Sequence, residues 1–309
     1  MTSALPGSSR AGYRWAACAA SVTGREHRHR GLGCDDAYSF GITGDFVVAA
    51  VADGAGSVTG TSAWGAYIAC RAVLDNALRP DFVDHYRHCA PNEAEGLIHW
   101  LFESALERVT RQAALMDLDS GLLATTLSVG VTDYQRAVFG QVGDGVIAAE
   151  CDGMVETLLI ERKDGYANTT SFLQSDHALD HHLRTTLRTG VTAFALSTDG
   201  MLYKITDVAS GQAYEPFFLD SWQHVRAGAS ADKFGELLNT IEDDQTGDDK
   251  TMVLVATVPT GPQSSDMPPE SIRDHSIPPS NLAAETTTVP IAPMHRHRRR
   301  TWFESARRS

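Results

Sequence analysis

The sequence lacks the cysteine patterns of a disulfide-bonded or zinc-binding protein. Its 309 residues include five cysteines, an odd number, and no two of them have the spacing of a paired ligand set. We therefore expect neither a disulfide framework nor a zinc site. The cysteines are Cys18, Cys34, Cys70, Cys89 and Cys151.

Long apolar runs are also missing. No stretch approaches the roughly 18 apolar residues that a membrane-spanning helix needs. The Ala-rich stretch Trp15–Val22 is too short to cross a bilayer and has no convincing cleavage site, so it reads as a first strand rather than a signal peptide. These absences predict a soluble, cytoplasmic protein.

Basic charge is scarce in most of the chain. The net charge is −13, and residues 261–309 carry 7 basic and 5 acidic residues, a balance of +2, which leaves −15 on residues 1–260. Such an acidic body argues against direct nucleic-acid binding, which needs a basic face. It is compatible with a cluster of carboxylates that holds cations.

Composition divides the chain into three parts. We expect residues 1–12 to be a flexible tail and residues 13–260 to form one globular domain, because only the latter stretch has a globular composition. Residues 261–309 are rich in Pro, Ser and Thr and end in "MHRHRRRTWFESARRS", which is typical of a disordered tail with a solvated basic end. An alternative is that Trp302, Phe303 and the arginines bind a partner, an anionic membrane or nucleic acid. We expect a monomer.

Hydrophobic patterns predict the regular elements. Two features favour an α+β fold with mainly antiparallel sheets over a doubly wound parallel sheet. Residues 125–151 read as consecutive strands joined by a tight turn, and helices do not alternate with every strand. The expected strands are Trp15–Val22, Phe46–Val51, Thr125–Val131, Arg136–Val142, Val146–Cys151, Val191–Ser197 and Thr251–Val258, and the expected helices are Ser62–Leu78, Glu93–Leu118 and Ala231–Ile241.

Aspartates stand at the ends of these strands or in tight turns. Any one Asp-Gly pair is an ordinary turn dipeptide. Together they indicate more, because strand ends that converge on one rim would gather carboxylates that repel one another unless cations neutralise them. Oxygen donors without His or Cys suit Mg²⁺ or Mn²⁺. The aspartates are Asp35 and Asp36 in "GCDDAYSF", Asp53 in "VADGAGS", Asp144 in "GQVGDGVIA", Asp199 in "LSTDGML", and Asp248 and Asp249 in "GDDKTMVLV".

The same loop that holds Asp53 offers a competing reading as a nucleotide-binding loop. The apolar run Val47–Val51 leads into glycines 54, 56 and 60, nearly the layout of a dinucleotide fingerprint. The Asp53 carboxylate would repel a phosphate, however. The acid about 20 residues further on, Asp75, falls inside a predicted helix rather than at a strand end. We therefore reject an oxidoreductase of this type.

Six motifs in order resemble the metal-dependent protein phosphatases, the type 2C serine/threonine family, and most closely its compact bacterial branch. They are "GCDDA", "VADGAGS" followed by "SAWGAYIA", "ATTLSVGV", "VGDG", "LSTDG" and "DDKTMVLV", and the resemblance spans about residues 13–258. It implies a four-layer α-β-β-α sandwich of two mainly antiparallel sheets flanked by helices. It also implies hydrolysis of phosphoserine or phosphothreonine in proteins by a hydroxide that bridges two metal ions. The substrates would be products of a serine/threonine kinase.

The resemblance implies a role for each aspartate. Two Mn²⁺ or Mg²⁺ ions are expected, and in some members a third, weaker one. Asp53 would bridge the first two ions, and the Gly54 carbonyl would complete the shell of one of them. Asp199 and Asp248 would bind one ion, Asp36 with Asp35 the other, and Asp144 the third.

Departures from the family pattern keep a second function open, that of a catalytically weak or inactive sensor or binding module. Many members have a phosphate-binding Arg where this chain has Gly31. Arg30 is the preferred substitute, with Arg28 and His27 as alternatives. Asp249 stands where Asn is frequent, which adds charge beside the site.

Two further features have open interpretations. We expect the cysteines, Cys34 included, to be packing residues, and the position of Cys34 beside the expected metal ligands Asp35 and Asp36 leaves redox sensitivity as an alternative. His177, His181 and His182 in "SDHALDHHL" fit no familiar metal-ligand spacing. They belong to the segment Glu161–Arg188, which corresponds to the variable, substrate-facing flap of the family.

Overall fold

The computed structural model describes residues 12–56, 60–161, 170–207, 209–228, 230–241 and 246–260. The tails expected at residues 1–12 and 261–309 lie outside these residues, apart from Gly12. Among the helices of the described part, none is long and apolar enough to cross a membrane.

Ten strands of the described residues form two five-stranded sheets in which all neighbouring strands are antiparallel. The first sheet has the order β1-β10-β9-β6-β7 and the second the order β2-β3-β4-β5-β8. The strands are β1 Tyr13–Val22, β2 Ala37–Thr43, β3 Phe46–Ala52, β4 Leu127–Thr132, β5 Ala137–Val142, β6 Val146–Cys151, β7 Met154–Ile160, β8 Arg184–Arg188, β9 Val191–Ser197 and β10 Lys250–Pro259.

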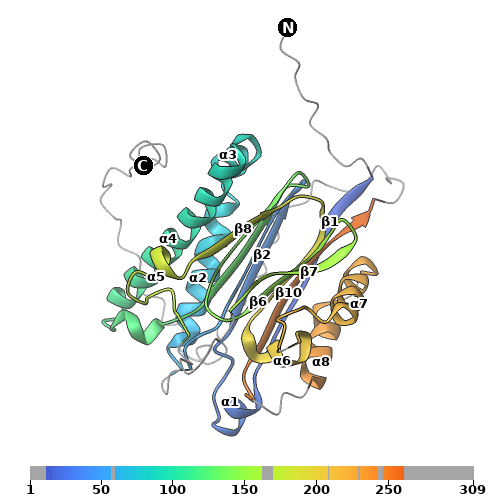
Figure 1. Ribbon diagram of the computed structural model, residues 1–309. Coiled ribbons are helices and arrows are strands. Elements are labelled where there is room, and N and C mark those ends of the chain that lie inside the picture. The colour runs from blue at the N-terminus through green and yellow to red at the C-terminus, as the bar shows by residue number, and fades with distance from the viewer. Residues whose placement is uncertain are drawn as a thin grey trace, which may run out of the picture.

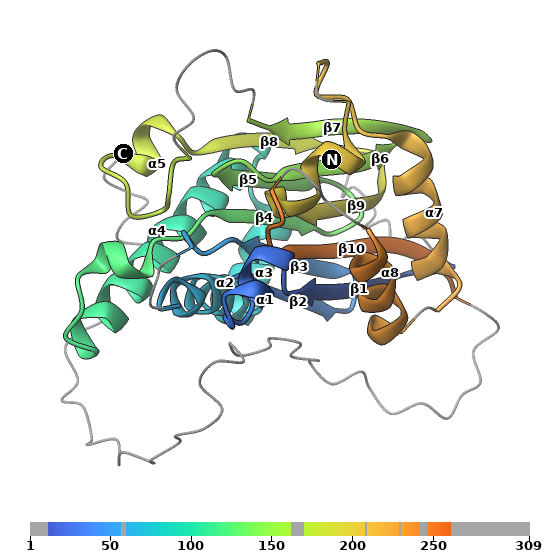
Figure 2. The ribbon, with the colours of Figure 1, turned by 90° about the horizontal axis from the view of Figure 1, so that it is seen from below.

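Helices cover the outer faces of the stacked sheets, with α2 and α4 on the second sheet and α7 and α8 on the first (Figures 1 and 2). This arrangement confirms the predicted four-layer α-β-β-α fold. The helices are α1 Arg25–His29, α2 Ser62–Ala77, α3 Pro80–His88, α4 Pro91–Leu115, α5 Ala178–His181, α6 Leu202–Ile205, α7 Glu215–Arg226 and α8 Ala231–Thr240, with 3-10 turns η1 Ser120–Leu123 and η2 Asp199–Met201.

Three hydrophobic clusters lie between the four layers. Strand β3 shows how the sequence makes this possible, since all seven of its residues are buried. Side chains alternate between the two faces of a strand. Val47, Ala49 and Val51 therefore join the cluster between the sheets, while Val48 and Ala50 join the cluster beneath α2 and α4. A strand of this kind reads as a continuous apolar run because both faces are covered.

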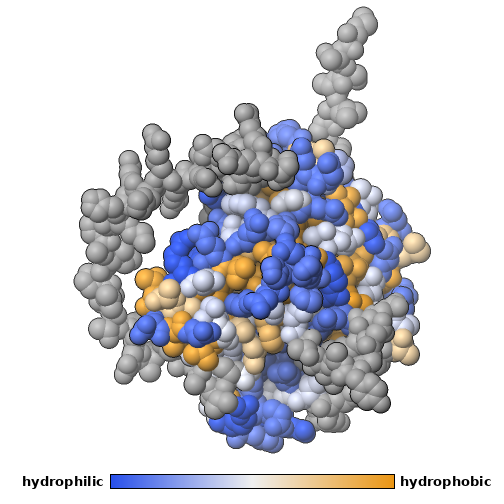
Figure 3. Space-filling model, turned by 60° about the vertical axis from the view of Figure 1, so that its left-hand side comes forward, coloured by the Kyte–Doolittle hydropathy of each residue, from blue (hydrophilic) through white to orange (hydrophobic). Residues whose placement is uncertain are grey.

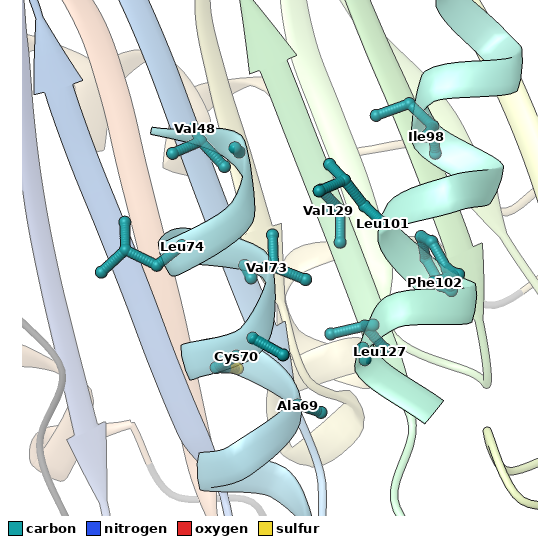
Figure 4. Packing of buried hydrophobic residues seen from close by; sticks show 14 of the residues in the cluster. Val48, Ala69, Cys70, Val73, Leu74, Ile98, Leu101, Phe102, Leu127 and Val129 are labelled. Carbon is teal, nitrogen blue, oxygen red and sulfur yellow. The ribbon is translucent and has the colours of Figure 1, made fainter. Parts of the chain in front are cut away.

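The cluster beneath α2 and α4 contains residues from both helices and from the second sheet. Figure 4 shows Val73 of α2 and Leu101 and Phe102 of α4 beside Leu127 and Val129 of β4. The side of α4 that faces away from this cluster carries exposed residues, whereas α2 is mostly buried. In the coloured part of Figure 3, hydrophilic residues are widespread and hydrophobic residues form smaller patches.

The seven strands and three helices predicted from the sequence are present, with ends that differ by a few residues. Three strands were not predicted, namely β2, β7 and β8. They lie at the edges of the sheets, and every residue of β8 is only partly buried. The partly exposed strands β7 and β8 need no continuous apolar run, so their sequence signal is weak. Strand β2 is mostly buried, and Ser39 and Gly41 interrupt its apolar pattern.

Replacing a buried leucine of α4 is expected to destabilise the protein much more than replacing an exposed one. Leu101 is fully buried, so Leu101→Ala should lower the free energy of unfolding by about 2–5 kcal/mol through lost burial and a cavity. Leu115, in the same helix, is 73% exposed, and Leu115→Ala should change it by less than about 0.5 kcal/mol. Urea unfolding measures both, and equal losses would contradict the assigned burial.

Candidate metal centre

Strand register brings the candidate ligands to one end of both sheets. In the second sheet, the pair Ala37 and Ala52 places the start of β2 beside the end of β3, and hence Asp36 near Asp53. In the first sheet, Ser197 at the end of β9 pairs with Met252 of β10 and with Val146 of β6. The same end of this sheet therefore carries Asp199, Asp248 and Asp144.

Asp53, Asp144 and Asp199 form the tightest group. One carboxylate oxygen from each lies within 4.8 Å of those of the other two, close enough for a single cation to contact all three. They follow β3, separate β5 from β6, and follow β9, respectively. The three residues therefore come from both sheets. Asp53 follows a strand of the second sheet, Asp199 follows a strand of the first, and Asp144 lies on the turn that connects the two sheets.

Asp36 reaches the same region from β2. Its Oδ2 atom accepts a hydrogen bond of 2.8 Å from the Thr198 hydroxyl, which links the second sheet to the first. Burial raises the pKa of Asp36 well above its ordinary value, and the charges of Asp249 and Asp248 raise it further. This carboxyl group therefore lies where a negative charge is unfavourable unless a cation is close by.

Asp53 is under the same constraint. Burial raises the pKa of its carboxyl group well above the ordinary value, followed by repulsion from Asp36, Asp199, Asp248 and Asp144. Because four neighbouring carboxylates contribute to the raised pKa of Asp53, the site suits a positively charged ligand.

The backbone of the Asp53 loop is held by the threonines of the "ATTLSVGV" motif. The Asp53 amide donates to the Thr126 hydroxyl at 3.0 Å, and the Asp53 carbonyl accepts from the Thr126 amide at 2.8 Å and the Thr125 hydroxyl at 2.9 Å. A Cβ atom on Gly54 would lie 2.7 Å from the Asp35 carbonyl oxygen and 2.9 Å from that of Ser62. Glycine is required at position 54 because the chain segments pass so close to each other.

Asp35 supplies a test of whether a cation fits. Its Oδ2 atom accepts from the Ser62 hydroxyl at 2.9 Å, whereas Oδ1 is buried and has no hydrogen-bond partner among the described residues. Burial raises the pKa of this carboxyl group. A buried oxygen without a donor is costly, and a bound divalent cation or a water held by that cation would satisfy it. The all-oxygen donor set also suits Mg²⁺ or Mn²⁺.

Asp248 and Asp249 have different roles although they are neighbours. Burial raises the pKa of Asp248, whose Oδ1 atom accepts from the Asp249 amide at 2.9 Å. The Asp249 carboxylate accepts the Gly24 amide at 2.6 Å on Oδ1, and the Asp35 amide at 2.6 Å on Oδ2. It also pairs with Nδ1 of His27 at 2.8 Å. Asp249 therefore holds residues 24–35, the segment that presents Asp35 and Asp36, to the start of β10.

The Asp249 contacts explain the departure from asparagine at this position. The two amides bind different oxygens, and an asparagine side chain has only one. From the sequence, Asp249 is expected only to add charge beside the site. No signal in the sequence pointed to its true partners, because they lie more than 200 positions away.

The three candidates for the phosphate contact are placed differently. His27 is buried against Asp249, and Arg28 donates to Oδ1 of Asn239 on α8 at 3.0 Å. Arg28 also lines a cavity of about 680 Å³ between α1 and α8. Arg30, at the end of α1, is exposed. Its role as a phosphate contact stays a prediction.

The other two open interpretations concern the flap and Cys34. The side chains of His177, His181 and His182 are exposed. Among the described residues, none of these histidines belongs to a group of three possible metal ligands. The described part of the flap does contact the centre, since the Thr170 hydroxyl donates to Oδ2 of Asp144 at 2.7 Å. Burial, followed by the charges of Asp36 and Asp249, raises the pKa of the Cys34 thiol well above its ordinary value. Redox sensitivity at Cys34 stays a prediction.

Comparison with known proteins gives a family and a set of similar folds. The sequence model of the family described as Protein phosphatase 2C matches residues 23–239. No curated protein sequence matches the chain. The similar solved structures include the serine/threonine phosphatase of S. agalactiae, with a TM-score of 0.55 and 14% identity over 79% of this chain and 99% of that chain. Stp1 from Staphylococcus aureus has a TM-score of 0.55 and 14% identity over 78% and 94%.

A third similar structure comes from work on the bacterial stressosome, a modular system adapted to control secondary messenger signalling. It has a TM-score of 0.51 and 14% identity over 78% of this chain and 99% of that chain. At these identities, the three structures establish a shared fold.

The raised pKa values predict how the metal-free protein responds to pH. A carboxyl group whose pKa is higher in the folded protein than in the unfolded chain, where it is about 3.9, stabilises the fold at low pH. That contribution is lost as pH rises through the folded-state pKa. In EDTA, Asp53→Asn should therefore raise Tm at pH 8, by about 2–4 °C for each kcal/mol of repulsion removed. The difference in Tm between the variant and the parent protein should become smaller toward pH 4.

Asp220→Asn, at an exposed position of α7, is the matched control and should give no gap that grows with pH. Thermal unfolding followed by circular dichroism measures all three proteins. A lower Tm for Asp53→Asn than for the parent at pH 8 would contradict the repulsion.

Asp249→Asn should destabilise the protein even in EDTA, because it leaves a buried amide of Gly24 or Asp35 without an acceptor. The expected loss is about 1–3 kcal/mol in the free energy of unfolding, measured with urea. Asp248→Asn, one position earlier, removes a repelled carboxylate and should not cause this loss. If the two variants lost equal stability, Asp249 would not be the residue that holds residues 24–35 to the start of β10.

Proposed function

Because the chain belongs to the protein phosphatase 2C family, we propose that it hydrolyses phosphoserine and phosphothreonine in proteins with divalent cations bound at the acidic centre. The observation that carries the proposal is the convergence of Asp53, Asp144 and Asp199 within 4.8 Å from three different strand ends. Carboxylates so close together are stable as a group of negative charges only when cations bind them.

The roles that the family resemblance implies for the individual residues form part of the proposal. Asp53 would contact two cations, with the Gly54 carbonyl beside it. Asp199 and Asp248 would complete one cation site, Asp36 with Asp35 the other, and Asp144 a third, weaker one. When bound, Mn²⁺ or Mg²⁺ lowers the pKa of a water molecule and neutralises charge on phosphoryl oxygens.

The rest of the site binds and orients the cations and the substrate. Thr198 fixes Asp36, Thr125 and Thr126 fix the Asp53 backbone, and Asp249 holds the segment that carries Asp35. Residues 1–260 carry a net charge of −15 and would repel a phosphorylated protein. Bound cations would therefore be needed to attract the phosphate as well as to activate water. Arg30 is the proposed phosphate contact of the protein itself.

The partners would be phosphoproteins made by a serine/threonine kinase. The structural likeness to two bacterial serine/threonine phosphatases and to a stressosome structure supports a role in bacterial signalling. A cytoplasmic location stays a prediction from the sequence.

A second candidate function, a sensor or binding module without turnover, is favoured by the phosphate-binding position. Gly31 replaces the usual Arg, His27 is bound to Asp249, and Arg28 is bound to Asn239. The side chains of His27 and Arg28 are thus held by other parts of the fold, whereas the side chain of Arg30 is exposed.

Hydrolysis of a phosphothreonine peptide by the full-length protein tests the proposal. Turnover should require Mn²⁺ and stop in EDTA. Asp53→Asn should reduce kcat/KM on the order of 100-fold or more, because it weakens the binding of the cations that neutralise charge on the phosphoryl oxygens. Asp220→Asn on the exposed surface of α7 is the control and should retain activity.

Two further variants separate the arginines in the same assay. Arg30→Ala should raise KM, whereas Arg28→Ala, in the same segment but bound to Asn239, should leave it unchanged. If no protein shows turnover while calorimetry detects Mn²⁺ binding that Asp53→Asn weakens, the sensor module is the correct function. Turnover that persists in EDTA would contradict both.

A further inference from the structure

A second group of potential metal ligands lies where α3 meets α4. His85 and Cys89 are four positions apart, one helical turn, and Glu93 is the third residue of α4. One ligand atom from each lies within 4.8 Å of those of the other two. Among the described residues, the only other such group of three is the acidic centre itself.

We propose that His85, Cys89 and Glu93 form a second metal site, which binds a borderline cation such as Zn²⁺ through one nitrogen, one thiolate sulfur and one carboxylate oxygen. Tetrahedral Zn²⁺ with bonds of about 2.0–2.3 Å places its ligand atoms roughly 3.3–3.8 Å apart. Because the three ligand atoms lie within 4.8 Å of one another, metal binding would draw them closer by at most about 1.5 Å, with water in the fourth position. His85 and Cys89 are half-buried and Glu93 is exposed, so a cation can reach them from solvent.

The backbone around the three ligands is already held in place. The Cys89 amide donates to the His85 carbonyl at 2.8 Å, and the Ala90 amide donates to Oε2 of Glu93 at 3.1 Å. That second contact uses one carboxylate oxygen, and Oε1 can bind the cation. Because the backbone is already fixed, less conformational entropy is lost when the cation binds.

Arg136 anchors this corner to the second sheet. Its guanidinium donates to the Cys89 carbonyl at 2.9 Å and to the Tyr86 carbonyl, and the Tyr86 hydroxyl donates to the Val131 carbonyl of β4 at 3.0 Å. The end of α3 is therefore fixed to the β4–β5 hairpin. A cation bound here would tie α3, α4 and this hairpin together.

Binding of the metal releases a proton. When the metal–sulfur bond forms, the Cys89 S–H bond breaks and the proton passes to solvent. One thiolate, one carboxylate and Zn²⁺ then sum to zero, and the Arg136 guanidinium beside them adds one positive charge. Arg136 Nη2 lies 3.6 Å from the sulfur and donates to it, which supports the thiolate. The last carbonyls of α3 carry negative partial charge, which also favours a cation at this helix end.

Ligand chemistry separates this site from the acidic centre. Imidazole and thiolate favour Zn²⁺, whereas the carboxylates of the centre favour Mg²⁺ or Mn²⁺. The cysteine spacing predicted no zinc site, because the familiar zinc-binding patterns contain paired cysteines. Only one cysteine contributes here. The proposal does not depend on phosphatase activity.

Cobalt spectroscopy of the metal-free, full-length protein tests the proposal. Co²⁺ should produce a thiolate-to-cobalt charge-transfer band in the near ultraviolet, and one equivalent of Zn²⁺ should remove it. Cys89→Ser should abolish the band. Glu93→Gln, which keeps an oxygen to accept from the Ala90 amide, should weaken Co²⁺ binding at least about tenfold.

Two control variants separate the new site from the acidic centre. Cys34→Ser removes the thiol beside that centre, and Asp53→Asn removes its central carboxylate. Both should keep the band, whatever happens to phosphatase activity. A band that survives in Cys89→Ser, or no band in the parent protein, would overturn the proposal.

A measurement on the parent protein covers the case in which Cys89→Ser fails to fold. Alkylation by iodoacetamide, followed for each cysteine by peptide mass spectrometry, should be slowed at Cys89 by Zn²⁺ but not by Mn²⁺. An alkylation rate at Cys89 that saturating Zn²⁺ leaves unchanged would overturn the second site.

Discussion

Repulsion among carboxylates at one end of the two sheets is the constraint on which the rest of the structure depends. Burial and neighbouring negative charges raise the pKa values of Asp36 and Asp53 far above the ordinary range. Groups in such an environment oppose folding near neutral pH. Three hydrophobic clusters, one between each pair of adjacent layers, supply the opposing free energy. The large core thus holds together a site whose own groups repel one another, and bound cations would remove that cost.

The same residue type serves two purposes at this end of the sheets. Asp249 receives two amide donors and the His27 ring, so its charge is satisfied by the protein. Within the part of the chain that the structure describes, Asp53 has no comparable set of donors, and repulsion from other carboxylates is a cause of its raised pKa. The donors decide which aspartate is structural and which is available to a cation. Close backbone approach makes this possible, since a Cβ atom on Gly200 would lie 1.8 Å from the Asp249 carbonyl oxygen.

The two groups of potential ligands differ in how they are built. The acidic centre collects residues from distant parts of the chain, and its geometry depends on the register of both sheets. His85, Cys89 and Glu93 lie within nine positions of one another, at the junction of two helices. The first group can exist only in the complete fold. The second needs α3, the start of α4 and the hairpin to which Arg136 fixes them.

The sequence by itself determined the α+β class with mainly antiparallel sheets and the interior elements, and its resemblance to a known family implied the four layers. Strands such as β3 and β10 are buried on both faces, so their apolar runs are continuous and easily read, and α2 and α4 show clear helical periodicity. The position of each aspartate at a strand end was likewise visible, and with it the expectation that the carboxylates converge. Edge strands such as β8 were missed, because partial exposure removes the apolar pattern that reveals a strand.

Only the tertiary structure decided what each side chain at the site contacts. The hydrogen bond from Thr198 to Asp36 and the clamp from Asp249 to residues 24–35 join positions 162 to 225 apart. The tertiary structure also showed that Arg28 contacts Asn239 of α8, which the sequence around Arg28 could not indicate. Local patterns fix which face of an element is apolar, because that depends on nearest neighbours along the chain. Partners across the fold depend on strand register and layer packing, which no local pattern encodes.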